Sequence, residues 1–158
     1  MTMSPDHGRN QKLYLEDLRV GQRFTSRTHL VDEAQIKAFA QQFDPQPFHL
    51  DHEAAKHSLF SGLVASGWHT AAITMRLLVE TGLPLAGGVI GAGGELSWPI
   101  PTRPGDTLYV ESEVLDITPS RSRPDRGVVT VRSLTRNQRN DVVQNLAAKL
   151  IVPTRIDV

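Results

Sequence analysis

The chain has 158 residues, no cysteine, and 17 basic against 17 acidic residues, so its formal net charge is zero. The lack of cysteine excludes disulfides, zinc–thiolate sites and a cysteine nucleophile, and the balanced charge gives no basic field of the kind that attracts nucleic acid. No apolar run approaches the roughly 18 residues that span a bilayer, and the N-terminus lacks the apolar core of a signal peptide. We therefore expect a cytoplasmic protein that binds neither nucleic acid nor membrane.

The first part of the chain predicts a loose segment followed by a strand. Residues 1–12 are polar and contain Pro and Gly, which is typical of a flexible N-terminal arm. The length of the remainder, residues 13–158, fits one domain. Residues 22–31 alternate with period two, which predicts a strand with these side chains on one face: Phe24, Ser26, Thr28 and Leu30.

A helix is predicted to begin after Asp32. Asp32 is a favourable N-cap, and Gln35 stands three residues later, as in a capping box. Val31 before the cap is placed to pack against Ile36 as a hydrophobic staple. The helix should end near Phe43, because the residue before a proline is disfavoured in the α region. Its apolar stripe consists of Ile36, Phe39, Ala40 and Phe43.

The stretch FDPQPFHLD, residues 43–51, comes at the end of this helix and shows neither helix nor strand period. Pro45 and Pro47 fix the backbone, so we expect a stiff irregular turn that carries Asp44 and His49. Asp51 is then placed to cap a short helix in HEAAKH, and residues 58–64 indicate an irregular connection.

A second helix is predicted to begin at Ser66 and Gly67 and to run to about Thr81, with Gly82 and Pro84 ending it. Apolar residues are spread around most of its circumference, which predicts a largely buried helix. These residues are Ala71, Ala72, Ile73, Met75, Leu77, Leu78 and Val79.

The remainder of the chain predicts antiparallel strands. The strands are expected over residues 87–98, 106–117, 127–138 and 141–152, with a Pro-Gly-Asp turn at 104–106, a polar loop at 120–126 and a hairpin at 137–141. Segregated helices and strands indicate an α+β fold, in which the sheet curls around the buried helix. Such a sheet has a free edge, which a second copy of the chain could cover.

Asp44 and His49 are the leading candidates for proton transfer. A general acid or base needs a fixed position and a suitable pKa, and a two-proline turn supplies rigidity. The alternative is structural, with Asp44 capping the turn and His49 filling a gap. Gly67 adds a backbone N–H at the positive end of the second helix, where an oxyanion is stabilised, although this glycine could equally serve tight packing.

Other polar residues give weaker signals. We expect no metal site, because the spacing of Asp44, His49, His52 and His57 offers no strong ligand set. His69 is expected to be packed or hydrogen-bonded rather than catalytic. The two tryptophans are expected in the core or a pocket wall, and the arginines of the 120–126 loop on solvated surface. The sequence has no phosphate-binding loop and no dinucleotide fingerprint, so we expect no cofactor.

The turn and the segments after it resemble the MaoC-like acyl dehydratases, a family that includes the (R)-specific enoyl-CoA hydratases. The resemblance is carried by Phe43-Asp44-Pro45-Gln46-Pro47-Phe48-His49 with Asp51, then by Val64-Ala65-Ser66-Gly67, and by the Pro-Gly-Asp turn at 104–106. It extends over about residues 14–152.

The resemblance implies a hot-dog fold, an antiparallel sheet wrapped around a long central helix, in a dimer or larger assembly. It also implies reversible hydration of a trans-2-enoyl-CoA to a 3-hydroxyacyl-CoA. Asp44 and His49 would hold the water, the Gly67 N–H would polarise the thioester, and Gln46, Ser66 and Trp68 would contact the substrate. Gln46 replaces the family's usual Asn. A serine that many members carry farther along the central helix has no clear equivalent here.

Two other functions are compatible with the sequence. A hot-dog thioesterase usually places a carboxylate on the central helix, and Glu80 near the end of this helix is the acid available there. A non-catalytic acyl-CoA-binding protein is the second alternative, since Gln46 departs from the family pattern.

Overall fold

The computed structural model describes residues 11–155 of the chain. The predicted arm, residues 1–12, therefore lies outside the described residues except for Gln11 and Lys12. The elements in chain order are η1 (Leu15–Asp17), β1 (Arg23–Thr25), β2 (His29–Leu30), α1 (Glu33–Phe43), α2 (Pro47–Leu50), α3 (His52–Lys56), α4 (Gly67–Leu77), η2 (Leu78–Gly82), β3 (Gly91–Ser97), β4 (Thr107–Pro119), β5 (Arg126–Arg136) and β6 (Val142–Pro153).

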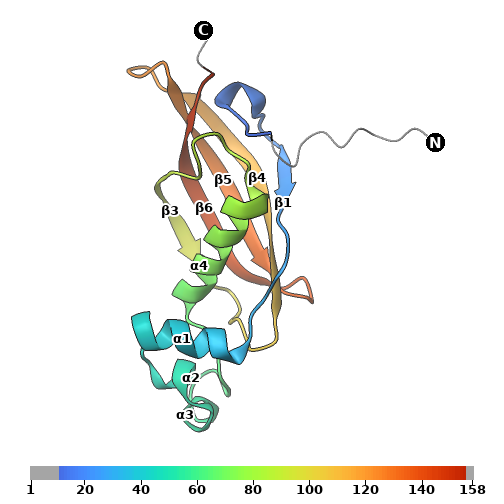
Figure 1. Cartoon of the computed structure of the whole chain (residues 1–158), viewed down its shortest axis with the longest axis vertical. Helices are drawn as coiled ribbons and strands as arrows, with labels where there is room; N and C mark the ends of the chain where they lie inside the picture. The colour runs from blue at the N-terminus through green and yellow to red at the C-terminus, as the bar shows by residue number, and fades with distance from the viewer. Residues whose placement is uncertain (1–10, 156–158) are drawn as a thin grey trace, which may run out of the picture.

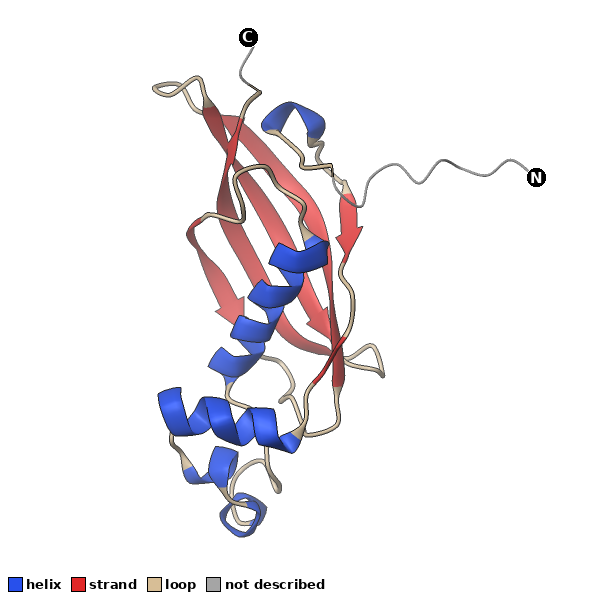
Figure 2. Ribbon diagram, viewed as in Figure 1, coloured by secondary structure: helices blue, strands red, loops and turns tan. Residues whose placement is uncertain are grey.

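The strands form one antiparallel sheet in the order β1-β4-β5-β6-β3, and β2 also pairs with β4. Helix α4 crosses one face of this sheet, while α1, α2 and α3 gather beyond the N-terminal end of α4 (Figures 1 and 2). The expected α+β arrangement of a sheet around one central helix is confirmed.

The long strands follow from their alternating sequences. Leu108, Val110 and Val114 of β4 share the face predicted for them and are fully or almost fully buried. The core between this face and α4 is built mainly from Leu and Val side chains, each of which contributes about 1.5–3 kcal/mol when fully buried. At the predicted hairpin, the Asn137 side chain accepts from the N–H groups of Arg139 and Asp141.

The predicted strand over residues 22–31 is wrong as a single element. It is two short strands, β1 and β2, and the chain departs from the β4 ladder between them. Ser26 lies in this gap, where its hydroxyl accepts from the Val110 N–H and donates to the Arg27 carbonyl. The Ser26 hydroxyl thus takes the place of one backbone acceptor, while the Ser26 N–H still donates to the Val110 carbonyl, and Leu30 lies exposed rather than on a buried face.

Helix α1 begins as predicted, because the Asp32 carboxylate accepts from the Gln35 N–H at 2.8 Å. The reciprocal half of the predicted capping box does not form, since the Gln35 side chain contacts Leu30 and His29 instead. Ile36 and Ala40 are buried as the stripe predicted, but Phe43 is exposed. The helix ends at Phe43, two residues before Pro45.

Helix α4 departs from the prediction that it is buried on most sides. Ser66 caps it by accepting from the Trp68 N–H, and its far end widens into the π-helical turn η2. The sheet covers Ile73 and Leu77, but the opposite side has no covering layer in a single chain. That exposed stripe consists of Trp68, Ala72, Met75 and Val79.

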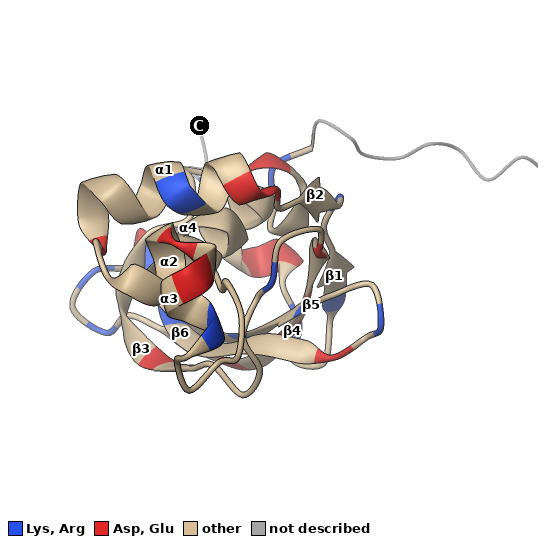
Figure 3. Ribbon diagram, turned by 90° about the horizontal axis from the view of Figure 1, so that it is seen from below, with Lys and Arg blue, Asp and Glu red and all other residues tan. Residues whose placement is uncertain are grey.

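Charged residues of both signs are interspersed over the end of the molecule formed by α1 to α3 (Figure 3). Within residues 11–155, no helix is both long and apolar enough to cross a membrane.

Candidate active site

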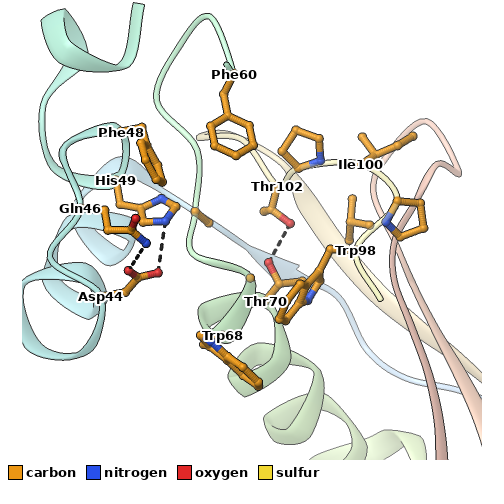
Figure 4. A pocket seen from close by; sticks show the side chains of 15 residues that line it. Asp44, Gln46, Phe48, His49, Phe60, Trp68, Thr70, Trp98, Ile100 and Thr102 are labelled. Atoms are coloured by element: carbon orange, nitrogen blue, oxygen red, sulfur yellow. Dashed lines mark hydrogen bonds and ion pairs between the residues drawn. The ribbon is translucent and has the colours of Figure 1, made fainter. Parts of the chain in front are cut away.

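A cavity of about 530 Å³ opens where α2 and the N-terminus of α4 meet the segment that follows β3. Asp44, Gln46 and His49 form one side of it, and Trp98 and Ile100 form the other (Figure 4). The remaining lining residues are mostly apolar, and they are Phe48, Phe60, Ala65, Gly67, Trp68, Thr70, Pro99, Pro101, Thr102 and Val143. A mostly apolar cavity with a few convergent polar groups is the usual form of a small-molecule site.

The first polar group in this cavity is the pair of Asp44 and His49. Asp44 follows the last residue of α1, and its N–H still donates to the Ala40 carbonyl. The stretch after it is not wholly irregular as predicted, because Pro47 begins the one-turn helix α2. Proline is favoured at the first helical position, where its missing N–H costs nothing. This turn brings His49 Nε2 within 3.2 Å of Asp44 Oδ2.

The proton positions of the pair follow from its other contacts. His49 Nδ1 lies 2.7 Å from the Val64 carbonyl oxygen, which can only accept, so Nδ1 carries a proton and Nε2 faces Asp44. His49 is almost fully buried, and Asp44 is half-buried. Burial raises the pKa of the Asp44 carboxyl, but hydrogen bonds from Ser66 and Gln46 and the charge of His49 together lower it below its ordinary value. Asp44 is therefore a carboxylate at neutral pH.

Gln46 and Ser66 act on Asp44. The Gln46 amide donates to Asp44 Oδ1 at 2.6 Å, so the longer side chain that replaces the family's usual Asn still supports the acid. Gln46 also lines the cavity, whereas Ser66 is fully buried and does not. The placement of Ser66 favours support of Asp44 and of the helix cap over the direct substrate contact that was expected.

Gly67 lies at the cavity wall as the first residue of α4, so its N–H has no partner inside the helix and the helix dipole favours negative charge there. The packing role that the sequence left open is also present. A Cβ at Gly67 would lie 2.7 Å from two ring carbons of Trp98, so only glycine leaves room for the indole.

We expect Gly67→Ala to lower the free energy of unfolding by about 1–3 kcal/mol, the usual cost of overpacking. Thermal unfolding measures this loss. When Gly67→Ala is made in the Trp98→Ala variant, most of the loss should disappear, because the clash is with the Trp98 ring. Gly91→Ala is the matched control, since a Cβ at Gly91 would have no other atom within 4 Å. Equal losses for both alanine variants would contradict the packing role.

The opposite wall was predicted only in part, because the two tryptophans were expected either in the core or in a pocket wall. Trp98 follows β3, and its ring meets Trp68 edge-on with ring centroids 5.2 Å apart, so both tryptophans belong to the pocket wall. Thr70 of α4 and Thr102 join their hydroxyls at 3.0 Å across the inner end of the cavity (Figure 4). These contacts join segments that are distant in sequence, and no local pattern signals them.

His69 lies outside the cavity lining and is packed, as expected. It is buried on the first turn of α4 and stacks on Phe39, with ring centroids 4.7 Å apart and planes 7° from parallel. Its Nδ1 has no hydrogen-bond partner within residues 11–155. Burial, followed by the charges of His29 and His49, lowers the pKa of His69 from 6.5 to about 4.

This pKa predicts a stability that depends on pH. The unfolded chain binds a proton at His69 below about pH 6.5, while the folded chain resists it until about pH 4. The contribution is therefore complete above pH 6.5 and is lost as the pH falls toward 4, by about 3 kcal/mol in all. The free energy of unfolding is measured with denaturant at several pH values. Between pH 4 and 6.5 it should change less with pH in His69→Gln than in the exposed control His57→Gln. The same pH dependence in both variants would contradict the lowered pKa of His69.

Other candidates do not reach the cavity. Glu80 lies in η2, just beyond the far end of α4, where it pairs with Arg27 and Arg76. Arg121 and Arg123 are exposed, and Arg126 pairs with Asp125, in line with a solvated loop. Across the described range 11–155, no three His, Asp or Glu residues are grouped closely enough to hold a metal ion.

Comparison with known proteins places these features in a family. The MaoC like domain matches residues 17–137. The chain is 38% identical over 128 residues to the uncharacterized protein YdeM of Bacillus subtilis, covering 79% of this chain and 88% of YdeM. It is 33% identical over 116 residues to the 3-hydroxybutyryl-CoA dehydratase of Methylorubrum extorquens, covering 70% of this chain and 69% of that protein.

Solved structures similar to this chain indicate the same family. The MaoC-like dehydratase from Rhodospirillum rubrum superposes with a TM-score of 0.91 at 69% identity, covering 92% of this chain and 99% of that one. The R-hydratase PhaJ1 from Pseudomonas aeruginosa superposes with a TM-score of 0.72 at 28% identity, covering 93% and 92%. The chain therefore belongs to the MaoC-like dehydratase family, and the expected hot-dog fold is confirmed.

Proposed function

We propose that the protein hydrates a trans-2-enoyl-CoA reversibly to a 3-hydroxyacyl-CoA. One observation carries this proposal: a carboxylate and an imidazole 3.2 Å apart in the wall of a cavity that also contains the N–H of Gly67. Similarity to two relatives, a 3-hydroxybutyryl-CoA dehydratase and an R-hydratase, supports the same class of reaction.

The catalytic groups divide the work between proton transfer and charge stabilisation. A water molecule binds between Asp44 and His49, and its oxygen attacks C3 while one of the pair removes its proton. The pair then returns a proton to C2 on the same face, so water is added with no net change in the enzyme. Negative charge develops on the thioester oxygen, where the Gly67 N–H and the dipole of α4 stabilise it. Dehydration takes the same path in reverse.

Substrate contacts beyond this core are assigned by position. Trp68 and Gln46 line the cavity and are placed to contact the acyl thioester, whereas Ser66 acts through Asp44. The thioesterase alternative is weaker, because Glu80 is held by two arginines away from the cavity. The binding-protein alternative is weaker because Gln46 preserves the support of Asp44 that its replacement of Asn put in doubt.

We also propose that residues 13–158 act as one domain and that two copies associate in the cytoplasm. The exposed face of α4 supports association, since Trp68, Met75 and Val79 form an apolar stripe that a second copy would bury. Light scattering of the purified protein should give twice the chain mass of 17.4 kDa or a higher multiple. A monomer at micromolar concentration would overturn this part of the proposal.

The reaction is tested by mixing purified protein with a panel of trans-2-enoyl-CoAs and recording the absorbance of the conjugated thioester and free thiol together. Hydration predicts loss of absorbance without thiol, and mass spectrometry should find a product heavier by one water. Release of thiol would identify a thioesterase. Tight binding without either change would identify a binding protein.

A further inference from the structure

We propose that Trp98, held in place by Gln144, limits the length of the acyl group that the cavity accepts. This inference rests on the proposed function, because it takes the Gly67 N–H as the contact of the thioester oxygen. It adds a specificity-determining residue, Trp98, and a positioning residue, Gln144, neither of which belongs to the catalytic pair.

Trp98 lies directly against the point where the thioester binds. Two indole carbons would be 2.7 Å from a Cβ at Gly67, so the ring packs against the backbone of the residue whose N–H faces the substrate. A thioester bound to that N–H therefore has the indole ring beside it. The first part of the acyl chain cannot turn toward this side without meeting the ring.

The opposite wall fixes where the chain begins. Asp44 and His49 lie across the cavity from Trp98 (Figure 4), and the water they hold must reach C3. The first three acyl carbons therefore occupy the space between these two walls. The rings of Phe48, Phe60 and Trp98 line the same cavity, so carbons beyond C3 would have to pass between these rings, which favours a short acyl group.

The Trp98 ring is anchored against displacement. Its Nε1–H donates to Gln144 Oε1 at 2.9 Å. Gln144 is fully buried on β6 and pairs with Thr135 of β5, so the acceptor is fixed by the sheet. The edge-on contact with Trp68 holds the ring from a second side.

Gln144 is an unfavourable core residue unless its side chain is needed to hydrogen-bond Trp98. Its Nε2 is buried and has no hydrogen-bond partner among residues 11–155. The amide cannot be turned over to relieve this, because Oε1 is needed to accept from the indole. A leucine would fill the same space without an unpaired donor. We therefore expect Gln144 to fix the orientation of the Trp98 ring.

A smaller residue at position 98 should open a path for longer chains. The indole is the group that a Cβ at Gly67 would meet, so a smaller side chain at position 98 frees volume inside the cavity beside the thioester. Each additional methylene that gains a place in an apolar pocket changes specificity by about 10–200-fold.

The test compares the wild type with Trp98→Leu, Trp98→Phe and Gln144→Leu. Two measurements are made on each: kcat/KM for crotonyl-, hexenoyl- and octenoyl-CoA, and the Kd of butyryl-, hexanoyl- and octanoyl-CoA. The wild type should prefer the shortest chain in both series. Trp98→Leu should raise the ratio of octenoyl to crotonyl turnover by at least about 10–200-fold, the effect of accommodating one of the four added methylenes, and Trp98→Phe, which keeps an aromatic wall, should raise it less.

Gln144→Leu distinguishes positioning from a structural role. It should shift the length ratio in the same direction as Trp98→Leu while the midpoint of thermal unfolding stays unchanged or rises. An unchanged ratio in Trp98→Leu, or a wild type that prefers octenoyl-CoA, would overturn the inference and leave the proposed function standing. If no enoyl-CoA is hydrated, the proposed function fails, and the Kd series alone decides the length limit. Equal affinity for butyryl-, hexanoyl- and octanoyl-CoA, or no binding of any of them, overturns the inference that Trp98 limits acyl length.

Discussion

Asp44→Asn is expected to lower kcat for enoyl-CoA hydration by about 10²–10⁴-fold, the usual contribution of a general acid or base. The change preserves the shape of the side chain, and its amide oxygen can still accept from Gln46. It removes the negative charge and the ability to take a proton from water. The fold should persist, because the helix end at Asp44 is held by its backbone N–H.

The measurement is kcat for crotonyl-CoA together with the midpoint of thermal unfolding. Asp51→Asn is the matched control, since Asp51 caps α3 outside the cavity and Asn is an equally good cap. The control should keep its rate. If Asp44→Asn also kept near-full turnover, Asp44 would not be catalytic. If Asp44→Asn unfolded, the role of Asp44 would be structural, as a cap of the turn.

His49→Asn should cause a loss of similar size. The Asn amide can replace His49 Nδ1 as donor to the Val64 carbonyl, so the buried contact survives, but no group remains where Nε2 faces Asp44. The proposed mechanism has both residues act on one water, so the double variant with Asp44→Asn should lose little more activity than either single variant.

His52→Asn is the control for this prediction, because His52 is exposed on α3 and contacts Glu33 outside the cavity. Turnover should be near wild type in the control and lost in His49→Asn, with both proteins folded. Additive losses in the double variant would indicate that Asp44 and His49 do not share one task.

The turn that carries Asp44 and His49 was predictable from the sequence because both groups lie close together along the chain. Two prolines fix the backbone, the cap at Asp32 sets where α1 begins, and both groups fall within six residues. The short helix α2 was missed because four residues are too few for a periodic pattern. The hydrogen bond that orients the His49 ring was also missed, because its acceptor, the Val64 carbonyl, lies 15 residues away.

The faces of α4 could not be predicted from composition alone. Apolar residues surround the helix, yet the sheet covers one side and leaves Met75 and Val79 exposed in a single chain. The same limit applies to the cavity wall opposite Asp44 and His49. Trp98 and Gln144 are 46 residues apart, and their contact follows from the pairing of β3 with β6 rather than from either local sequence.

Hydration of an enoyl thioester through Asp44 and His49 is the central claim for this protein. The most direct measurement is the absorbance of the conjugated thioester when wild type and Asp44→Asn each meet crotonyl-CoA, with free thiol recorded in the same sample. We expect loss of absorbance with wild type alone and no thiol release. Equal loss with both proteins, or release of thiol, would contradict the claim.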